Sequence, residues 1–342
     1  MIKIQNLYYM LAYAFRFLKE DGTAHVDTES FEHAADLCAA LLVLGMSKQI
    51  KRGLAKDYML HTESITSPRG RIDVAASIKE RAPFKKQLVC DFDEYTENTK
   101  INQIVKTTLL LLLRSKEVSL TQKKELRRIV LYLRQVGTVH LTSVQWSSIQ
   151  YQRNNVTYRM LINICEFIVK SNLLSTQEGY SKQKQVTDDQ AMHVLFEKFV
   201  LGYYQKHHPS LRPASSHIEW QVDNDERDFL PRMKSDITLY KENRTLIIDT
   251  KYYKSALQHN SLYNKKTIHS SNLYQMYTYV KNKDMFQTGL VSGLLLYAKT
   301  DEEIAPNQSY IMESNRVSVK TLELNTNFSN IKDQLEKILK DF

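Results

Sequence analysis

The stretch "LPRMKSDITLYKENRTLIIDTKYY", from Leu230 to Tyr253, holds two strand-like runs and two aspartates. Met233–Tyr240 alternates moderately well between apolar and polar residues. Thr245–Asp249 contains a continuous apolar run, which is typical of a strand in the middle of a sheet. The four polar residues at 241–244 form a connection of hairpin length. The sequence therefore predicts an antiparallel hairpin here.

The connection also predicts the register of this hairpin. If the turn is centred between Glu242 and Asn243, Asp236 lies directly opposite Asp249. The β-carbons of such a pair are about 5 Å apart, and like charges placed in this way destabilise a sheet. Lys251 follows two residues later and returns to the same face. A shift of one residue would send Asp236 to the opposite face, so the prediction depends on the register.

Two interpretations of the acidic pair remain open. Crowded carboxylates need a proton or a cation between them, and a hard divalent cation, Mg²⁺ (or Mn²⁺), resolves the conflict with oxygen ligands. Two carboxylates and a lysine at one point are the groups used in metal-assisted hydrolysis of phosphodiesters. The alternative is an ordinary hairpin whose charged side chains are solvated strand ends, since D-x-K alone is a very weak motif.

The charge of the chain is basic and unevenly distributed. The 342 residues include 47 Lys and Arg against 38 Asp and Glu, a net charge of +9. Between Arg227 and Lys283 there are 11 Lys and Arg against 4 Asp and Glu, so most of the excess surrounds the hairpin. This favours contact with the DNA backbone, with solubilising loops as the alternative.

Other features of the composition exclude several classes of protein. The three cysteines, Cys38, Cys90 and Cys165, are odd in number and far apart, which fits a reducing cytosol rather than a disulfide framework. We expect a cytoplasmic protein without a membrane partner, because neither a signal peptide nor a long apolar span is present. No P-loop motif occurs, so any nucleotide hydrolysis would come from another chain.

The pattern of elements predicts an α+β protein with two domains. Helical patterns and short strands around "SPRGRID" (Ser67–Asp73) predict a mostly helical N-terminal domain, residues 1–180, and polar Ser175–Gln185 marks the junction. Residues 181–342 predict a mixed sheet flanked by helices. The first helix, rich in tyrosine, is interpreted as buried within its own domain, with a partner surface as the alternative. The predicted helices are 7–18, 31–44, 98–116, 121–135, 153–173, 191–205 and 271–280, and the strands outside the hairpin are 216–222 and 290–298.

The hairpin and its neighbours resemble a known group of enzymes. Asp236, followed by Asp249-Thr250-Lys251 after two strands, resembles the PD-(D/E)xK nuclease superfamily. Glu197 in "LFEKFV" looks like the accessory acid of that superfamily, with a solvated helix flank as the alternative. "QMYTY", with Gln275 and Tyr279, is similar to the Q-x-x-x-Y element of RecB-like nucleases.

More narrowly, the chain resembles the McrC family, the nuclease subunit of McrBC-type 5-methylcytosine restriction systems, and its LlaJI- and BsuMI-type relatives. The motifs occur in family order along nearly the whole chain. The chain departs from the family at Asn98, where an aspartate is usual, and Pro231 is not adjacent to Asp236. The motifs are "NLYYMLAYAF", "RGRID", "DEYTENTKINQIVKTTL", "LFEKFV", "MKSDITL", "DTKYY" and "YQMYTY".

The resemblance implies a restriction-endonuclease-like C-terminal domain and a Mg²⁺-dependent DNA endonuclease subunit that works with an McrB-like AAA+ GTPase on double-stranded DNA. Its metal ligands would be Asp236, Asp249, the carbonyl of Thr250 and Glu197. Lys251 would position the attacking water and stabilise the transition state, and Gln275 would act close to it.

Further roles follow from the resemblance and from the charge pattern. DNA contacts are expected from Lys254, Lys265, Lys266 and Tyr279. Arg69 and Arg71 would either anchor an acidic loop or meet the GTPase partner. Three other functions stay open: a stand-alone type II-like restriction endonuclease, a non-catalytic activator of an AAA+ partner, and a structural DNA-binding protein.

Overall fold

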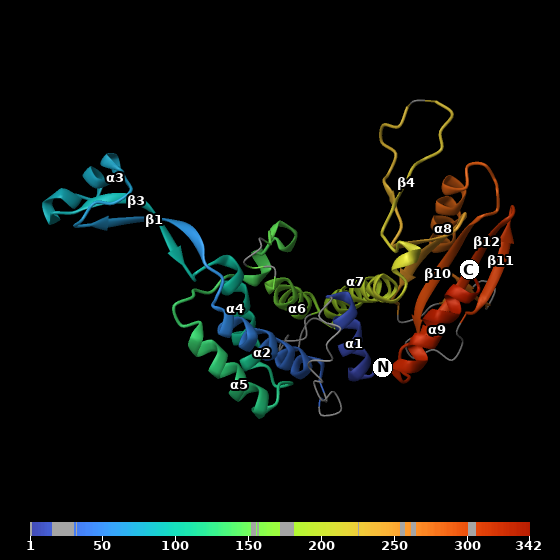
Figure 1. The fold of residues 1–342 in the computed structure, drawn as a ribbon, viewed down its shortest axis with the longest axis horizontal. Helices are drawn as coiled ribbons and strands as arrows, with labels where there is room; N and C mark the ends of the chain where they lie inside the picture. Colours follow the sequence, from blue (N-terminus) through green and yellow to red (C-terminus); the bar gives the residue numbers. More distant parts are fainter. Residues whose placement is uncertain are drawn as a thin grey trace. The chain divides into compact units, whose positions relative to one another are not determined.

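The computed structural model describes residues 2–15, 31, 33–151, 155, 157–171, 181–224, 226–253, 257–260, 265–299 and 306–342, the side chains of 181–188, 257–260 and 265 excepted. The chain forms two compact units, which are described separately (Figure 1). The sheet unit comprises Met1–Leu37 and Lys170–Phe342, and the helical unit comprises Cys38–Val169. Among the described residues, no helix combines the length and apolar composition that crossing a membrane requires.

The first helix, α1 (Ile4–Ala14), corrects the predicted division at residue 180. It belongs to the sheet unit, where it packs against α7 (Ser181–His207) and α9 (Phe328–Lys340). A β-carbon on Gly202 of α7 would lie 2.4 Å from the carbonyl oxygen of Tyr13, so only glycine permits this approach. The helix is buried as predicted, but in the other unit, because its apolar surface is covered by elements remote in sequence.

A mixed five-stranded sheet forms the centre of the sheet unit, with the order β11-β12-β10-β7-β6. The three inner strands are parallel, and the two edge strands pair in antiparallel fashion. This confirms the predicted mixed sheet, although β11, β12 and α9 were not predicted. The strands are β6 (Ile237–Lys241), β7 (Arg244–Lys251), β10 (Val291–Lys299), β11 (Gln308–Met312) and β12 (Asn315–Glu323).

The hairpin of β6 and β7 has the predicted register. The pairs run from Lys241 opposite Arg244 to Ile237 opposite Ile248. The predicted strand Met233–Tyr240 is, however, broken at Ser235, because β5 (Met233–Lys234) pairs with β4 (His217–Ile218) in a separate two-stranded sheet. The strand expected at 216–222 is correspondingly shorter. The chain therefore bends immediately before β6, at Asp236.

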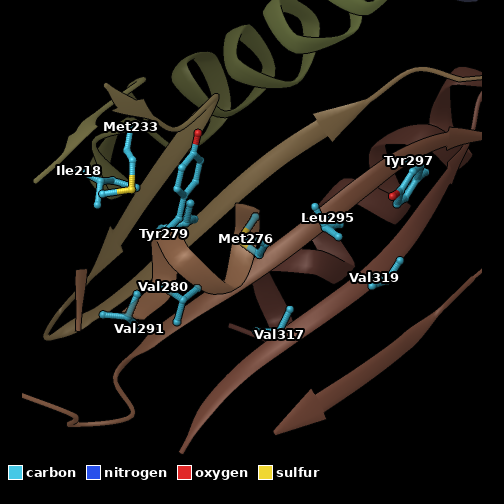
Figure 2. Close-up of a cluster of buried hydrophobic side chains, with 11 residues drawn as sticks. Ile218, Met233, Met276, Tyr279, Val280, Val291, Leu295, Tyr297, Val317 and Val319 are labelled. Atoms are coloured by element: carbon cyan, nitrogen blue, oxygen red, sulfur yellow. The ribbon is translucent and has the colours of Figure 1, made fainter. Parts of the chain in front are cut away.

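The helix α8 (Ser270–Lys283) covers the face of the sheet on which alternate residues of β7, β10 and β12 lie. Figure 2 shows Met276 and Val280 of α8 with Leu295 of β10 and Val317 of β12 in this core. Residues 257–260 (β8) and 265–268 (β9) form a separate antiparallel pair between β7 and α8. The end of β7 lies beside α8, because Lys251 of β7 donates a hydrogen bond to Gln275 of that helix.

The helical unit contains helices and an antiparallel three-stranded sheet with the order β1-β3-β2. The predicted turn in "SPRGRID" is confirmed: Gly70 has φ +69°, and a β-carbon there would lie 2.2 Å from the carbonyl oxygen of Asp91. Asn98 Oδ1 accepts a hydrogen bond from Gly137 N, a role that an aspartate would fill equally. The elements are α2 (Ala34–Arg52), β1 (Asp57–Ile65), β2 (Arg71–Ile72), α3 (Val74–Lys79), β3 (Leu88–Thr96), α4 (Lys100–Arg114), α5 (Leu120–Tyr132), α6 (Tyr158–Lys170) and the short 3-10 helix η2 (Ala82–Lys85).

Candidate active site

Asp236 lies at the bend before β6, one position beyond the last pair of the hairpin. Its Oδ2 accepts hydrogen bonds from the backbone N and the Oγ1 of Thr250, each at 2.7 Å. The carboxylate of Asp236 therefore accepts the hydrogen bond from Thr250 N in place of a backbone acceptor of a longer β6. The predicted direct cross-strand pairing with Asp249 is thus replaced by a side-chain contact to the residue after it.

Asp249 is a buried carboxylate at the end of β7, with 2% of its surface exposed. Burial first, and the charge of Asp236 second, raise its pKa to about 6. Lys251 Nζ lies 2.8 Å from Asp249 Oδ2 and forms an ion pair with it. Burial by itself would lower the pKa of Lys251, but the Asp249 carboxylate outweighs burial and raises it. The pair therefore stays charged near neutral pH.

The α8 side of the site orients Lys251. Its Nζ donates to Gln275 Oε1 at 3.3 Å, and Gln275 Nε2 donates to the hydroxyl of Tyr279 at 2.9 Å. Gln275 is thus found beside the lysine, as the sequence indicated. Tyr279 was predicted as a DNA contact, but only 7% of its surface is exposed, and Figure 2 shows it among the core residues. Its ring packs in the core, and its hydroxyl is connected to the site by the hydrogen bond from Gln275.

The α7 side contributes Glu197 and a residue that the sequence interpretation missed. Glu197 is half-buried, and burial first, then Asp236, raise its pKa to about 7, so it is not simply a solvated helix flank. His193, one turn earlier, is also half-buried, and burial lowers its pKa while the charges of Asp236 and Lys251 act on it. The spacing of His193 and Glu197, four residues apart on one helix, was the available signal.

The donors of the site match a hard divalent cation in kind. Asp249 is a buried carboxylate crowded by Asp236, and the charges of both act on Glu197. Among the residues that the structure describes, no three His, Cys, Asp or Glu side chains are gathered closely enough to hold a metal ion. The charges of the predicted carboxylate ligands thus act on one another, although their side chains do not form a close cluster. The Thr250 carbonyl remains a predicted ligand.

The remaining predicted contacts are distributed over both units. Lys266 is exposed on β9, whereas Lys254 and the side chain of Lys265 lie outside the described residues. Arg69 and Arg71 are exposed in the helical unit, where the guanidinium carbon of Arg69 lies 3.6 Å from the centroid of the Phe92 ring. Their roles toward DNA and a partner stay predictions.

Comparisons with known proteins identify the family of the chain. Residues 3–298 match the family described as "McrBC 5-methylcytosine restriction system component". The "Type IV methyl-directed restriction enzyme EcoKMcrBC" of Escherichia coli (strain K12) is 28% identical over 345 residues, covering 100% of this chain and 98% of that protein.

A solved structure is similar in fold. It is the refined half-complex from a tetradecameric assembly of Thermococcus gammatolerans McrB AAA+ hexamers with bound McrC, with a TM-score of 0.50 and 14% sequence identity over 99% of this chain and 76% of that chain. The family resemblance seen in the sequence motifs is confirmed by the family match. The chain belongs to the McrBC 5-methylcytosine restriction system component family.

Proposed function

We propose that the chain is the Mg²⁺-dependent DNA endonuclease subunit of a restriction complex, with a PD-(D/E)xK-type nuclease in its sheet unit. The observation that carries the proposal is the buried Asp249 at the end of β7, next to Asp236 and paired with Lys251. Burying one carboxylate beside another costs free energy unless a proton or a cation lies between them, and this supports a cation site here.

Asp236, Asp249, Glu197 and the carbonyl of Thr250 would hold the cation. A bound divalent cation supplies Lewis-acid stabilisation of phosphate charge and a water that deprotonates near neutral pH. The chain prepares this chemistry by holding Asp236 on the Thr250 amide and hydroxyl. The raised pKa of Glu197, about 7 without a cation, means that a cation competes with a proton for this carboxylate near neutral pH.

Lys251 would stabilise the negative charge that develops on the phosphate oxygens. Its ammonium is largely buried, with 12% of the side chain exposed, so its charge acts through a medium of low dielectric constant. Gln275 Oε1 accepts a hydrogen bond from this ammonium, and Gln275 Nε2 in turn donates one to the Tyr279 hydroxyl. This chain of contacts limits the positions that the ammonium can take.

Double-stranded DNA is the proposed substrate. The basic excess around the hairpin, together with the exposed Lys266 on β9, supports contacts to backbone phosphates. Lys254 and Lys265 belong to the same proposed surface by sequence.

An McrB-like AAA+ GTPase is the proposed partner. The similar fold found in a complex of McrB AAA+ hexamers with McrC supports it. The helical unit also exposes large apolar side chains, which are typical of interaction surfaces: 69% of Leu60, 68% of Ile78 and 90% of Phe84 are exposed. Arg69 and Arg71 lie on the same small sheet region and would contribute to this interface.

The test is cleavage of plasmid and methylated DNA by the chain assembled with its AAA+ partner, GTP and Mg²⁺. We expect cleavage by the wild type, its loss with EDTA, and its loss in Asp249→Asn. Asp333→Asn is the matched control, because Asp333 is an exposed carboxylate on α9 of the same unit. Cleavage that persists in Asp249→Asn would refute the site, and cleavage without the partner would favour the stand-alone alternative.

A further inference from the structure

His193 carries a ring nitrogen that the fold leaves without a partner. The side chain is half-buried on α7, and its Nδ1 is buried without a hydrogen-bond partner among the described residues. Buried polar atoms of folded proteins are bonded in the great majority of cases. An imidazole kept in this state beside a reactive site indicates that its partner is a molecule absent from the free chain.

The surroundings of His193 distinguish it from Glu197 on the same helix face. Both residues lie on α7, which packs against β7. The charges of Asp236 and Asp249 act on Glu197, whereas those of Asp236 and Lys251 act on His193. Asp236 thus acts on both residues, and the ammonium of Lys251, beside which an anion would bind, lies within electrostatic range of His193.

Two other roles for this imidazole fit less well. A structural core histidine would use its buried nitrogen in an internal hydrogen bond, which Nδ1 does not make with the described residues. A metal ligand in this site would be an oxygen atom, because hard divalent cations such as Mg²⁺ prefer oxygen ligands and the imidazole offers only nitrogen. The lowered pKa of His193 leaves the ring neutral at pH 7, with one N–H to donate.

We propose that His193 is a further substrate-contacting residue, which donates a ring N–H to a non-bridging oxygen of the scissile phosphodiester together with Lys251. The inference rests on the proposed nuclease function. The imidazole keeps its proton throughout: it binds the phosphate oxygen and supports the charge that grows there in the transition state. A preorganised donor of this kind is worth most when charge develops on its acceptor.

The test compares His193→Leu, His193→Gln and the control His217→Gln, since His217 is exposed on β4 of the same unit. Each variant is assembled with the AAA+ partner, and kcat and KM for DNA cleavage are measured with Mg²⁺. We expect kcat to fall about 100-fold in His193→Leu with little change in KM, as for the loss of one preorganised donor. His193→Gln, which retains an N–H donor, recovers at least part of that loss, and the control cleaves like the wild type.

Two measurements on the chain without its partner separate the alternatives. Mn²⁺ affinity by calorimetry and the melting temperature in EDTA stay at wild-type values in His193→Gln if the residue contacts phosphate. A selective loss of Mn²⁺ affinity would instead make it a metal ligand, and a lower melting temperature with no change in kcat would make it structural; either result overturns the inference. If the wild type cleaves and His193→Leu cleaves equally, this inference alone fails, whereas a wild type that never cleaves defeats the proposed function as well.

Discussion

Two aspartates of the sheet unit are both nearly inaccessible to solvent but chemically opposite, and Asp249 lies deep in the protein whereas Asp284 lies close to its surface. Asp249 is 2% exposed and Asp284 is 4% exposed. Asp284, just after α8, accepts hydrogen bonds from Thr288 N and Oγ1, Gly289 N and Asn315 Nδ2, at 2.6–3.0 Å. Burial would raise its pKa, but these donors outweigh burial and lower it.

Asp249 has no comparable set of donors among the described residues. Its contact is the ion pair with Lys251, and its pKa is raised to about 6. The difference shows that this fold can satisfy a buried carboxylate completely where it serves the structure. At Asp249 the fold does not supply such donors, as expected of a carboxylate that binds a ligand absent from the free chain.

The largest effect is expected from the substitution of Asp249, which we propose to be catalytic whereas Asp284 is structural. Asp249→Asn should lower DNA cleavage by the assembled complex at least about a thousandfold, because it removes a proposed metal ligand. The circular dichroism spectrum of the variant should remain that of a folded protein. Plasmid cleavage with Mg²⁺ measures the effect, with Asp333→Asn as the control, and a loss of less than tenfold would argue against the assignment.

The reverse effect is expected at Asp284, where the carboxylate is structural. Asp284→Ala leaves the donors of Thr288, Gly289 and Asn315 without their acceptor, so we expect roughly 3–5 kcal/mol less free energy of unfolding. Urea denaturation followed by fluorescence measures it. If the variant is as stable as the wild type, the contrast between the two aspartates does not hold.

A smaller effect is expected where Lys251 is held. Gln275→Leu removes the acceptor that fixes the ammonium and should lower kcat about tenfold, since a misplaced donor stabilises the transition state less well. Tyr279→Phe, which removes only the hydroxyl bonded to Gln275, should cost less. Steady-state cleavage kinetics of both variants test the order, and a larger loss in Tyr279→Phe would contradict it.

The smallest effect concerns Glu197 and the pH dependence of stability. Its pKa in the folded chain, about 7, exceeds the ordinary value of 4.5, so the protonated form favours folding and this contribution disappears as the pH rises through 7. Glu197→Gln should therefore melt higher than the wild type at pH 8 in EDTA, by roughly 2 °C. The difference should vanish near pH 4.5; a gain that is equal at both values would indicate a cause other than the carboxylate charge.

Local patterns were sufficient to predict the hairpin and several of the residues that lie near one another at its end. The polar turn at 241–244 specified the register, although Asp236 contacts Thr250 at the end of the hairpin instead of pairing with Asp249. The family motifs added Gln275, which lies beside Lys251. These predictions succeeded because the determining residues are close in sequence or lie on one helix face.

Features set by distant segments were not predicted. The bend at Asp236 depends on the pairing of β5 with β4, and the position of α1 depends on α7 and α9. His193 was not predicted as a site residue, because its environment depends on how α7 lies against β7. Such tertiary contacts leave no periodic signal in the segment concerned.

The most direct test of the account is metal binding to the free chain with its proton balance. Mn²⁺ is titrated calorimetrically at pH 6.5 in two buffers of different ionisation enthalpy. Because the pKa values of Asp249 and Glu197 are raised to about 6 and about 7, binding should release roughly one proton per ion, and Asp249→Asn should lose the binding. Absence of binding, binding without proton release, or an unchanged result in Asp249→Asn would contradict a metal site at the end of β7.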